Sequence, residues 1–205
     1  MLGEMSVKEF LEKTASKAPV PGGGSVAALS AGIAASLTEM VANLTIGKKG
    51  YEEVEKEMEE LLNKAKELRD KFVEDIDRDS NAFDKVMESF KLPKDTDEQK
   101  EKRKKAIQEA FKNAALVPLD VAKNAYKMMD LAKVVIEKGN KNAVTDGAVA
   151  CMMARTAVLS ALYNVKINLG SIKDEKFVQK LSKEVEELES KVNKEEEEIL
   201  SKVEL

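Results

Sequence analysis

The feature that most constrains this chain is a pair of long, nearly uncharged segments in a sequence that is otherwise rich in charge. Residues 25–46 carry one charged side chain, Glu39, and residues 143–165 carry two, Asp146 and Arg155. A helix that is apolar on all sides lies either at the centre of a bundle or in a membrane. Both segments contain more alanine and serine than leucine, and their neighbours are amphipathic. We therefore expect two buried central helices of a soluble bundle, and no membrane partner.

The remaining segments, between clusters of glycine and proline, have the periodicity of amphipathic helices. Apolar side chains recur at three- and four-residue steps through residues 52–90 and 174–203. Only 4% of the 205 residues are aromatic, which argues against a strand-rich fold. Pro118 should kink or split the segment around it, because proline lacks an amide proton. The predicted helices cover residues 5–17, 25–46, 52–90, 97–116, 119–138, 143–168 and 174–203. The prediction is an all-α, up-and-down helical bundle, formed as a single domain over residues 1–205.

Small side chains on the first apolar segment indicate a close helix contact. Ala28, Gly32 and Ser36 recur at every fourth position and therefore share one face. A bundle of this size has little room to hide two apolar helices completely. We therefore expect a homodimer, related by a two-fold axis, that buries their outer faces.

Composition excludes several classes of site and partner. The chain contains no histidine, the commonest general base and a common zinc ligand, and we expect no metal site. One cysteine, Cys151, cannot form an internal disulfide, which favours a reducing compartment. Residues 1–24 lack a basic stretch followed by an apolar run, so no signal peptide is expected and the predicted location is the cytoplasm. The 34 basic and 38 acidic side chains give a net charge of −4, which makes nucleic acid an unsuitable partner.

Three consecutive glycines precede the first apolar segment. Gly22, Gly23 and Gly24 lead directly into Ser25. Glycine lets a ligand approach the backbone closely, and the free amides of a helix start favour an anion. The structural alternative is a tight connection with Ser25 as the helix N-cap. Both interpretations stay open at this point.

Polar groups also lie just after the first apolar segment and at the start of the second. Lys48 and Lys49 follow the first, where they either complement the helix dipole or bind a substrate carboxylate. Asn142 and Asp146 open the second. There Asn142 or Thr145 could cap the helix, with Asp146 favoured by the dipole. Alternatively, Asp146 serves as an acid, a base or a cation partner.

Polar residues on apolar faces are informative because burial costs free energy unless the group is paired. Asp79 lies within the apolar stripe of the third segment. Glu39 lies on the first apolar segment, and Arg155, Asn164 and Asn168 lie on or just beyond the second. The simplest interpretation joins Glu39 and Arg155 as a buried ion pair. Taken together, several acids and amides that face one core suggest a ligand pocket.

Six motifs, in a fixed order, carry a resemblance to a known family. They are PGGGSVAAL at 21–29, LTIGKKGY at 44–51, DSNAFDKVM at 79–87, LPK at 92–94, GNKNAVTDGAVA at 139–150 and NVKINL at 164–169. The chain resembles the formiminotetrahydrofolate cyclodeaminase / methenyltetrahydrofolate cyclohydrolase family, roughly from Ser6 to Asp174. The resemblance implies an all-helical, dimeric enzyme that handles one-carbon units on tetrahydrofolate, with no cofactor beyond that substrate.

The resemblance leaves the reaction open between two chemistries. The enzyme either hydrolyses 5,10-methenyltetrahydrofolate or cyclises 5-formiminotetrahydrofolate with release of ammonia. The alternative is a catalytically silent helical module that binds folate or a protein partner.

The family motifs and the polar residues on apolar faces together define a predicted site. It consists of Gly22, Gly23, Gly24, Ser25, Glu39, Lys48, Lys49, Asp79, Asn142, Asp146, Asn164 and Asn168. Without histidine, either a carboxylate whose pKa is raised by apolar surroundings or a lysine whose pKa is lowered must move the proton, and we expect Asp146 or Asp79 to do so. Asn164 and Asn168 are expected to orient the pterin, and the lysines or the glycine-rich helix start to bind the anionic tail. Replacing Asp146 with asparagine is expected to abolish turnover in a folded protein.

Overall fold

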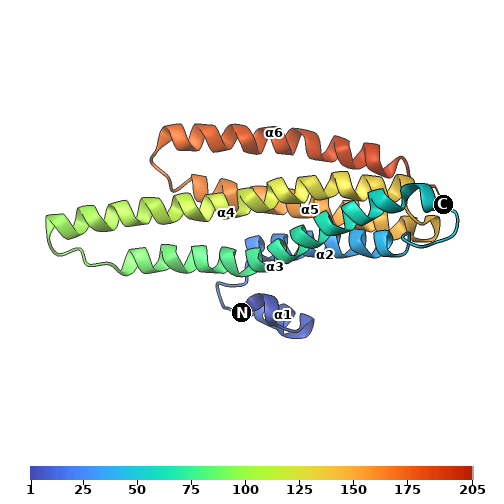
Figure 1. Cartoon of the computed structure of the whole chain (residues 1–205). Helices are drawn as coiled ribbons and strands as arrows, with labels where there is room; N and C mark the ends of the chain where they lie inside the picture. The colour runs from blue at the N-terminus through green and yellow to red at the C-terminus, as the bar shows by residue number, and fades with distance from the viewer. Residues whose placement is uncertain (205) are drawn as a thin grey trace.

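The computed structural model describes residues 1–204, which form an all-helical bundle without a strand (Figure 1). The α-helices are α1 (Val7–Thr14), α2 (Gly23–Asn43), α3 (Glu55–Lys91), α4 (Asp97–Lys138), α5 (Val144–Leu169) and α6 (Glu175–Leu200). Three short 3-10 helices, η1 (Leu2–Glu4), η2 (Glu52–Val54) and η3 (Lys141–Ala143), precede α1, α3 and α5. The predicted all-α bundle is confirmed.

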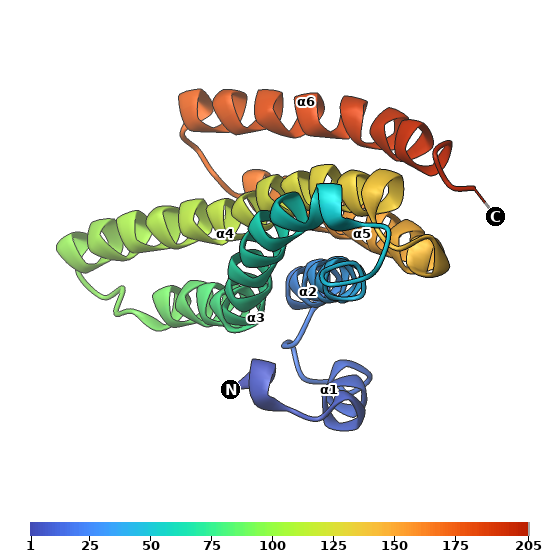
Figure 2. The ribbon, with the colours of Figure 1, turned by 45° about the vertical axis from the view of Figure 1, so that its right-hand side comes forward.

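The two apolar helices, α2 and α5, lie side by side in the core. They run in opposite directions, because Gly23 at the start of α2 lies beside Asn164 late in α5, whereas Asn140, just before α5, bonds Thr45 just after α2. Figure 2 shows α3, α4 and α5 around α2, with α6 packed on the outer side of α4 and α5. Alanine dominates the buried positions of both central helices, so their backbones approach closely.

By length and composition alone, α2 and the segment from Lys141 to Leu169 could each cross a membrane. Within the protein, however, 61% and 50% of their most apolar stretches are buried. Large side chains from the flanking helices, such as Phe72 of α3 and Met128 of α4, are fully buried in the same core. The predicted central placement of both apolar helices is therefore confirmed.

Pro118 does not interrupt the fourth helix, so the predicted split at this position is wrong. Residues 97–116 and 119–138 belong to one continuous helix, α4. Proline cannot donate a hydrogen bond to the carbonyl four residues earlier, that of Ala114. The side chain of Asn168 on α5 donates to that carbonyl at 3.0 Å. Contact with the neighbouring helix thus satisfies the group that would otherwise disfavour a continuous helix.

The helix caps that were the structural alternatives for Ser25, Asn142 and Thr145 do not form. Gly22 is the N-cap of α2, and Ser25 lies in the first turn of that helix. The side chain of Asn140 accepts a hydrogen bond from the backbone amide of Asn142 at 3.1 Å and so caps η3. Since η3 leads directly into α5, neither Asn142 nor Thr145 caps that helix.

A network of ion pairs fixes α3 against α4. Asp75 is fully buried on α3 and pairs with Lys71 and Arg78. Both cations also reach Asp120 on α4, at 2.6 Å from Lys71 and 3.1 Å from Arg78. Burial raises the pKa of Asp75, although the two cations oppose that shift. The network lies one helical turn before Asp79 and therefore helps to set the position of that residue.

Candidate active site

A cleft of about 410 Å³ lies beside the start of α2, between that helix, α3, α4 and α5. Its lining is mainly apolar and includes a few polar groups, as is usual for small-molecule sites. The apolar lining comes from Val20, Ala82, Phe83, Val86, Met87, Phe90, Phe111, Ala114 and Ile167. The polar side chains in the lining are Asp79, Asn164 and Asn168. The structure therefore brings together three of the predicted polar residues and the triple glycine.

The glycines are needed because α2 begins against the side chains of two other helices. A Cβ atom on Gly24 would lie 2.0 Å from Oδ1 of Asp79, and one on Gly23 would lie 3.1 Å from Nδ2 of Asn164. At the first distance, a side chain on residue 24 would fit only if α2 or the carboxylate of Asp79 moved. No side chain caps this start of α2, and its dipole favours a negative charge beside it. The triple glycine thus lets the positive end of α2 approach the carboxylate of Asp79.

Asp79 is the titratable group of the cleft. Its Oδ2 atom lies 3.0 Å from the hydroxyl of Ser25, which is fully buried and can donate instead to the carbonyl of Ile76 at 3.1 Å. Burial raises the pKa of Asp79, and hydrogen bonds from the hydroxyl and the backbone of Ser25 only partly oppose that shift. A carboxyl group with a raised pKa in a cleft is suited to proton transfer.

The two asparagines offer hydrogen-bond acceptors to the cleft. Nδ2 of Asn164 donates to the carbonyl of Ser160 at 2.9 Å. Nδ2 of Asn168 donates to two carbonyls, those of Asn164 at 2.8 Å and Ala114 at 3.0 Å. No side chain or amide in residues 1–204 donates to either Oδ1 atom. Both amide oxygens therefore stay available to a ligand.

The other predicted site residues lie at the opposite end of the bundle. Lys48 and Lys49 follow α2, and Asn142 and Asp146 lie at the start of α5. Asp146 and Asn164 are 18 residues apart on α5, which corresponds to about 27 Å along a helix. Within one chain, the fold does not bring Asp146 to the cleft.

Glu39 lies away from the cleft, and the predicted ion pair with Arg155 is wrong. Glu39 faces α3 and pairs with Arg69 at 3.0 Å, while its other oxygen, Oε1, is buried without a partner. Burial raises the pKa of Glu39, and Arg69 opposes the shift. Arg155 faces α6 instead, where Nη2 donates to the side chain of Asn193 at 2.9 Å. The two predicted partners point towards different neighbouring helices.

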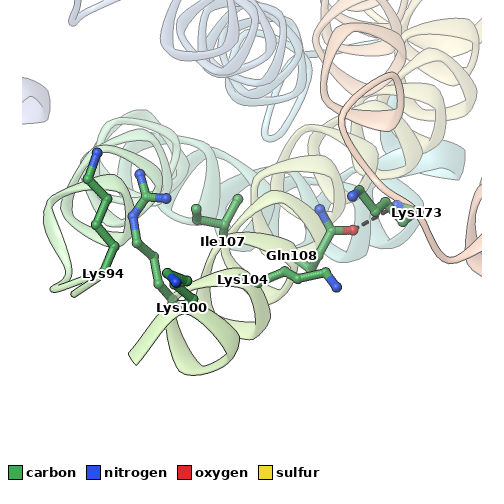
Figure 3. Close-up of a pocket in the computed structure, with 7 residues that line it drawn as sticks. Lys94, Lys100, Lys104, Ile107, Gln108 and Lys173 are labelled. Carbon is green, nitrogen blue, oxygen red and sulfur yellow. Dashed lines mark hydrogen bonds between the residues drawn. The ribbon is translucent and has the colours of Figure 1, made fainter. Parts of the chain in front are cut away.

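Sequence reasoning missed a cationic pocket beside the aromatic wall of the cleft. Figure 3 shows its lining residues, which are Lys94, Lys100, Arg103, Lys104, Ile107, Gln108 and Lys173. The Arg103 guanidinium lies 5.7 Å from the ring centroid of Phe90, and Phe90 lines the cleft. The signal in the sequence was the run of four cations at residues 102–105.

Comparisons with known proteins agree with this architecture. Residues 6–187 match the family model described as formiminotransferase-cyclodeaminase. The chain is 44% identical over 188 residues to a methenyltetrahydrofolate cyclohydrolase of Methylorubrum extorquens, covering 92% of this chain and 90% of that protein. It is 36% identical to a formimidoyltransferase-cyclodeaminase of Gallus gallus, covering 87% of this chain but only 33% of that longer protein.

A solved structure gives the same result. The crystal structure of a formiminotetrahydrofolate cyclodeaminase from Thermotoga maritima superposes with a TM-score of 0.88 at 33% identity. The superposition covers 99% of this chain and 98% of the other. Sequence and fold agree over nearly the whole length, and this chain therefore belongs to the formiminotransferase-cyclodeaminase family.

Proposed function

We propose that this protein is a folate one-carbon enzyme that hydrolyses 5,10-methenyltetrahydrofolate to the 10-formyl form. The observation that carries this proposal is the partly buried carboxyl group of Asp79, which lines a cleft together with aromatic side chains and two free amide oxygens. The cyclohydrolase of Methylorubrum extorquens, matched over 90% of its length, supports hydrolysis as the reaction.

The chemistry of the substrate suits a carboxylate. The methenyl bridge is a cationic amidinium, which an ionised Asp79 stabilises electrostatically. In the proposed reaction, the oxygen of a water molecule attacks the methenyl carbon while Asp79 accepts a proton from that water. The bond from this carbon to N5 then breaks, its electron pair stays on N5, which takes up a proton, and the new hydroxyl group loses its proton to become the formyl carbonyl. One further proton is released to solvent, and the reaction needs no metal or redox cofactor.

The two asparagines and the aromatic wall suit the rest of the ligand. A pterin ring carries N–H donors, which match the free Oδ1 atoms of Asn164 and Asn168. Its flat faces suit the apolar wall that contains Phe83 and Phe111. These contacts would orient the methenyl carbon relative to Asp79.

A second candidate is the cyclisation of 5-formiminotetrahydrofolate with release of ammonia, supported by the name of the superposed Thermotoga protein. In that reaction N10 attacks the formimino carbon, and the leaving nitrogen must be protonated. A carboxyl group whose pKa is raised by burial can supply that proton.

One pair of assays tests both reactions. Decay of the methenyl absorbance is followed with and without protein, since the uncatalysed hydrolysis sets the baseline. Ammonia release from 5-formiminotetrahydrofolate is measured in parallel. Faster methenyl decay supports the cyclohydrolase, and ammonia release alone favours the cyclodeaminase. Saturable folate binding without either reaction would reject both and indicate a catalytically silent module.

The cationic pocket should bind the anionic tail of the folate. Lys94 and Lys173 line it without an ion pair to another residue of 1–204. Reversing both charges (K94E/K173E) should raise KM by about tenfold, because two attractive contacts become repulsive. Added salt should reduce the difference in KM between this variant and the wild type. The matched control, K180E/K183E, makes the same change in net charge on α6, and an equal rise in KM there would contradict the assignment.

We also propose a homodimer formed through the outer faces of α2 and α5. That surface exposes large apolar side chains, among them Ile33 and Met40 on α2 and Val149 and Met152 on α5. Because α2 and α5 are antiparallel, a two-fold axis perpendicular to them would bring the Asp146 end of one copy to the cleft of the other. This arrangement accounts for two groups of family motif residues at opposite ends of one chain.

Complementation tests the shared site. D79N and D146N alone should each be inactive, and an equimolar mixture of refolded chains should recover about a quarter of wild-type activity, because half of the dimers are mixed and each has one intact site. The double variant D79N/D146N mixed with wild type is the control for exchange, because activity should fall to about a quarter of wild type if the chains exchange and stay at about half if they do not. A monomeric mass in solution, or activity that stays absent in the mixture, would contradict the proposal.

A further inference from the structure

Pro118 occupies an unusual position, because it is buried 21 residues into the 42-residue helix α4. A proline in a helix interior removes one backbone hydrogen bond and crowds the carbonyl four residues earlier. Here that carbonyl belongs to Ala114, which lines the cleft and is only 8% exposed. The proline therefore leaves an acceptor without its helical partner at the edge of the candidate site.

The side chain of Asn168 supplies the missing hydrogen-bond donor. Its Nδ2 atom donates to the carbonyls of Ala114 at 3.0 Å and of Asn164 at 2.8 Å, so both amide hydrogens are used. The opposite orientation of the amide would place Oδ1 against two carbonyl oxygens, which is repulsive. The two carbonyls therefore fix the orientation of this side chain, and Oδ1 is its only free polar atom.

We propose that Pro118 is a positioning residue for the active site. By withholding its own backbone amide from the Ala114 carbonyl, it leaves that carbonyl open to the side chain of Asn168 and so holds Oδ1 ready to accept a hydrogen bond from an N–H group of the bound ring. Pro118 does not itself contact the substrate in this arrangement. The catalytic part of the inference rests on the proposed folate chemistry, whereas the coupling between Pro118 and Asn168 does not.

A double-mutant cycle on stability tests the coupling. N168A should raise the unfolding equilibrium constant of the wild-type protein by about tenfold, because a buried carbonyl loses its donor. In a P118A background the new backbone amide donates to that carbonyl. N168A should then raise the unfolding equilibrium constant by about twofold or less. N164A is the matched control, because the side-chain amide of Asn164 donates to the Ser160 carbonyl, which Pro118 does not affect. N164A should therefore change the unfolding equilibrium constant equally in both backgrounds. An equal cost of N168A in both backgrounds would overturn the proposal.

Kinetics test the positioning role. P118A should unfold less readily than the wild type, since alanine restores the helical hydrogen bond. It should nevertheless raise KM for 5,10-methenyltetrahydrofolate by about tenfold, with kcat changed less, because Asn168 is released from its fixed orientation. A more stable P118A protein with an unchanged KM would overturn the positioning role. If the wild type turns over no folate, the proposed function fails, and the stability cycle still decides whether Pro118 fixes Asn168.

Discussion

Replacing Asp79 with asparagine should reduce turnover by about 10²- to 10⁴-fold, the range of a lost general acid or base. Asparagine keeps the shape of the side chain and an acceptor for the Ser25 hydroxyl, but it cannot take up a proton. The measurement is methenyl decay under single-turnover conditions, which separates chemistry from product release. Near-normal turnover in D79N would remove Asp79 from the mechanism.

The stability of D79N is the control for folding. Burial raises the pKa of Asp79 in the folded state, so folding favours its protonated form. The stabilisation from that proton is fully present below the ordinary aspartate pKa and is lost as pH rises through the folded-state value. At neutral pH, D79N should therefore be at least as resistant to denaturant as the wild type. The acid limb of kcat/KM in the wild type should lie above the ordinary aspartate range and be absent from the residual activity of D79N.

Gly24→Ala should have the second-largest effect. Its Cβ would lie 2.0 Å from Oδ1 of Asp79, so either α2 or the carboxylate must move. Such overpacking typically costs about 1–3 kcal/mol of stability, and a displacement of about 1 Å in a catalytic group can cost about 10²-fold in rate. Both the denaturation midpoint and kcat/KM should fall.

Gly32→Ala is the matched control in the same helix. Its Cβ would lie 3.8 Å from the Cβ of Phe72, an ordinary contact. Since alanine has a higher helix propensity than glycine, the free energy of unfolding of this variant should rise by about 0.5–1 kcal/mol. Equal stability and activity in the Gly24 and Gly32 variants would show that close approach to Asp79 is not the reason for the glycine.

The fold was predictable because its signals are local. The apolar character of residues 25–46 and the three- and four-residue steps of residues 52–90 depend only on neighbouring side chains, and both became helices close to the expected bounds. Pro118 was mispredicted because its effect depends on a donor from α5, about 50 residues away in the chain. A single helix considered in isolation cannot reveal such a partner.

The candidate site was predictable in part for the same reason. Asp79 and Asn164 stood out as polar groups on apolar faces, and the structure brings both to the triple glycine. Glu39 carried the same signal, yet it faces Arg69, because periodicity identifies a face of a helix but not the neighbour opposite it. Phe111 and the cationic pocket were missed, since their place beside the cleft depends on how α3 and α4 pack.

The alanine-rich contact between α2 and α5 also limits which substitutions could change the ligand specificity of this protein. Alanine has no rotamers to adjust, so a larger residue at Ala31 or Ala157 would push the two central backbones apart and disturb the bundle as a whole. A change of specificity towards a larger or smaller substrate would therefore have to come from the outer helices. Side chains there that line the cleft, such as Phe83 and Phe111, can be substituted without displacing α2 and α5.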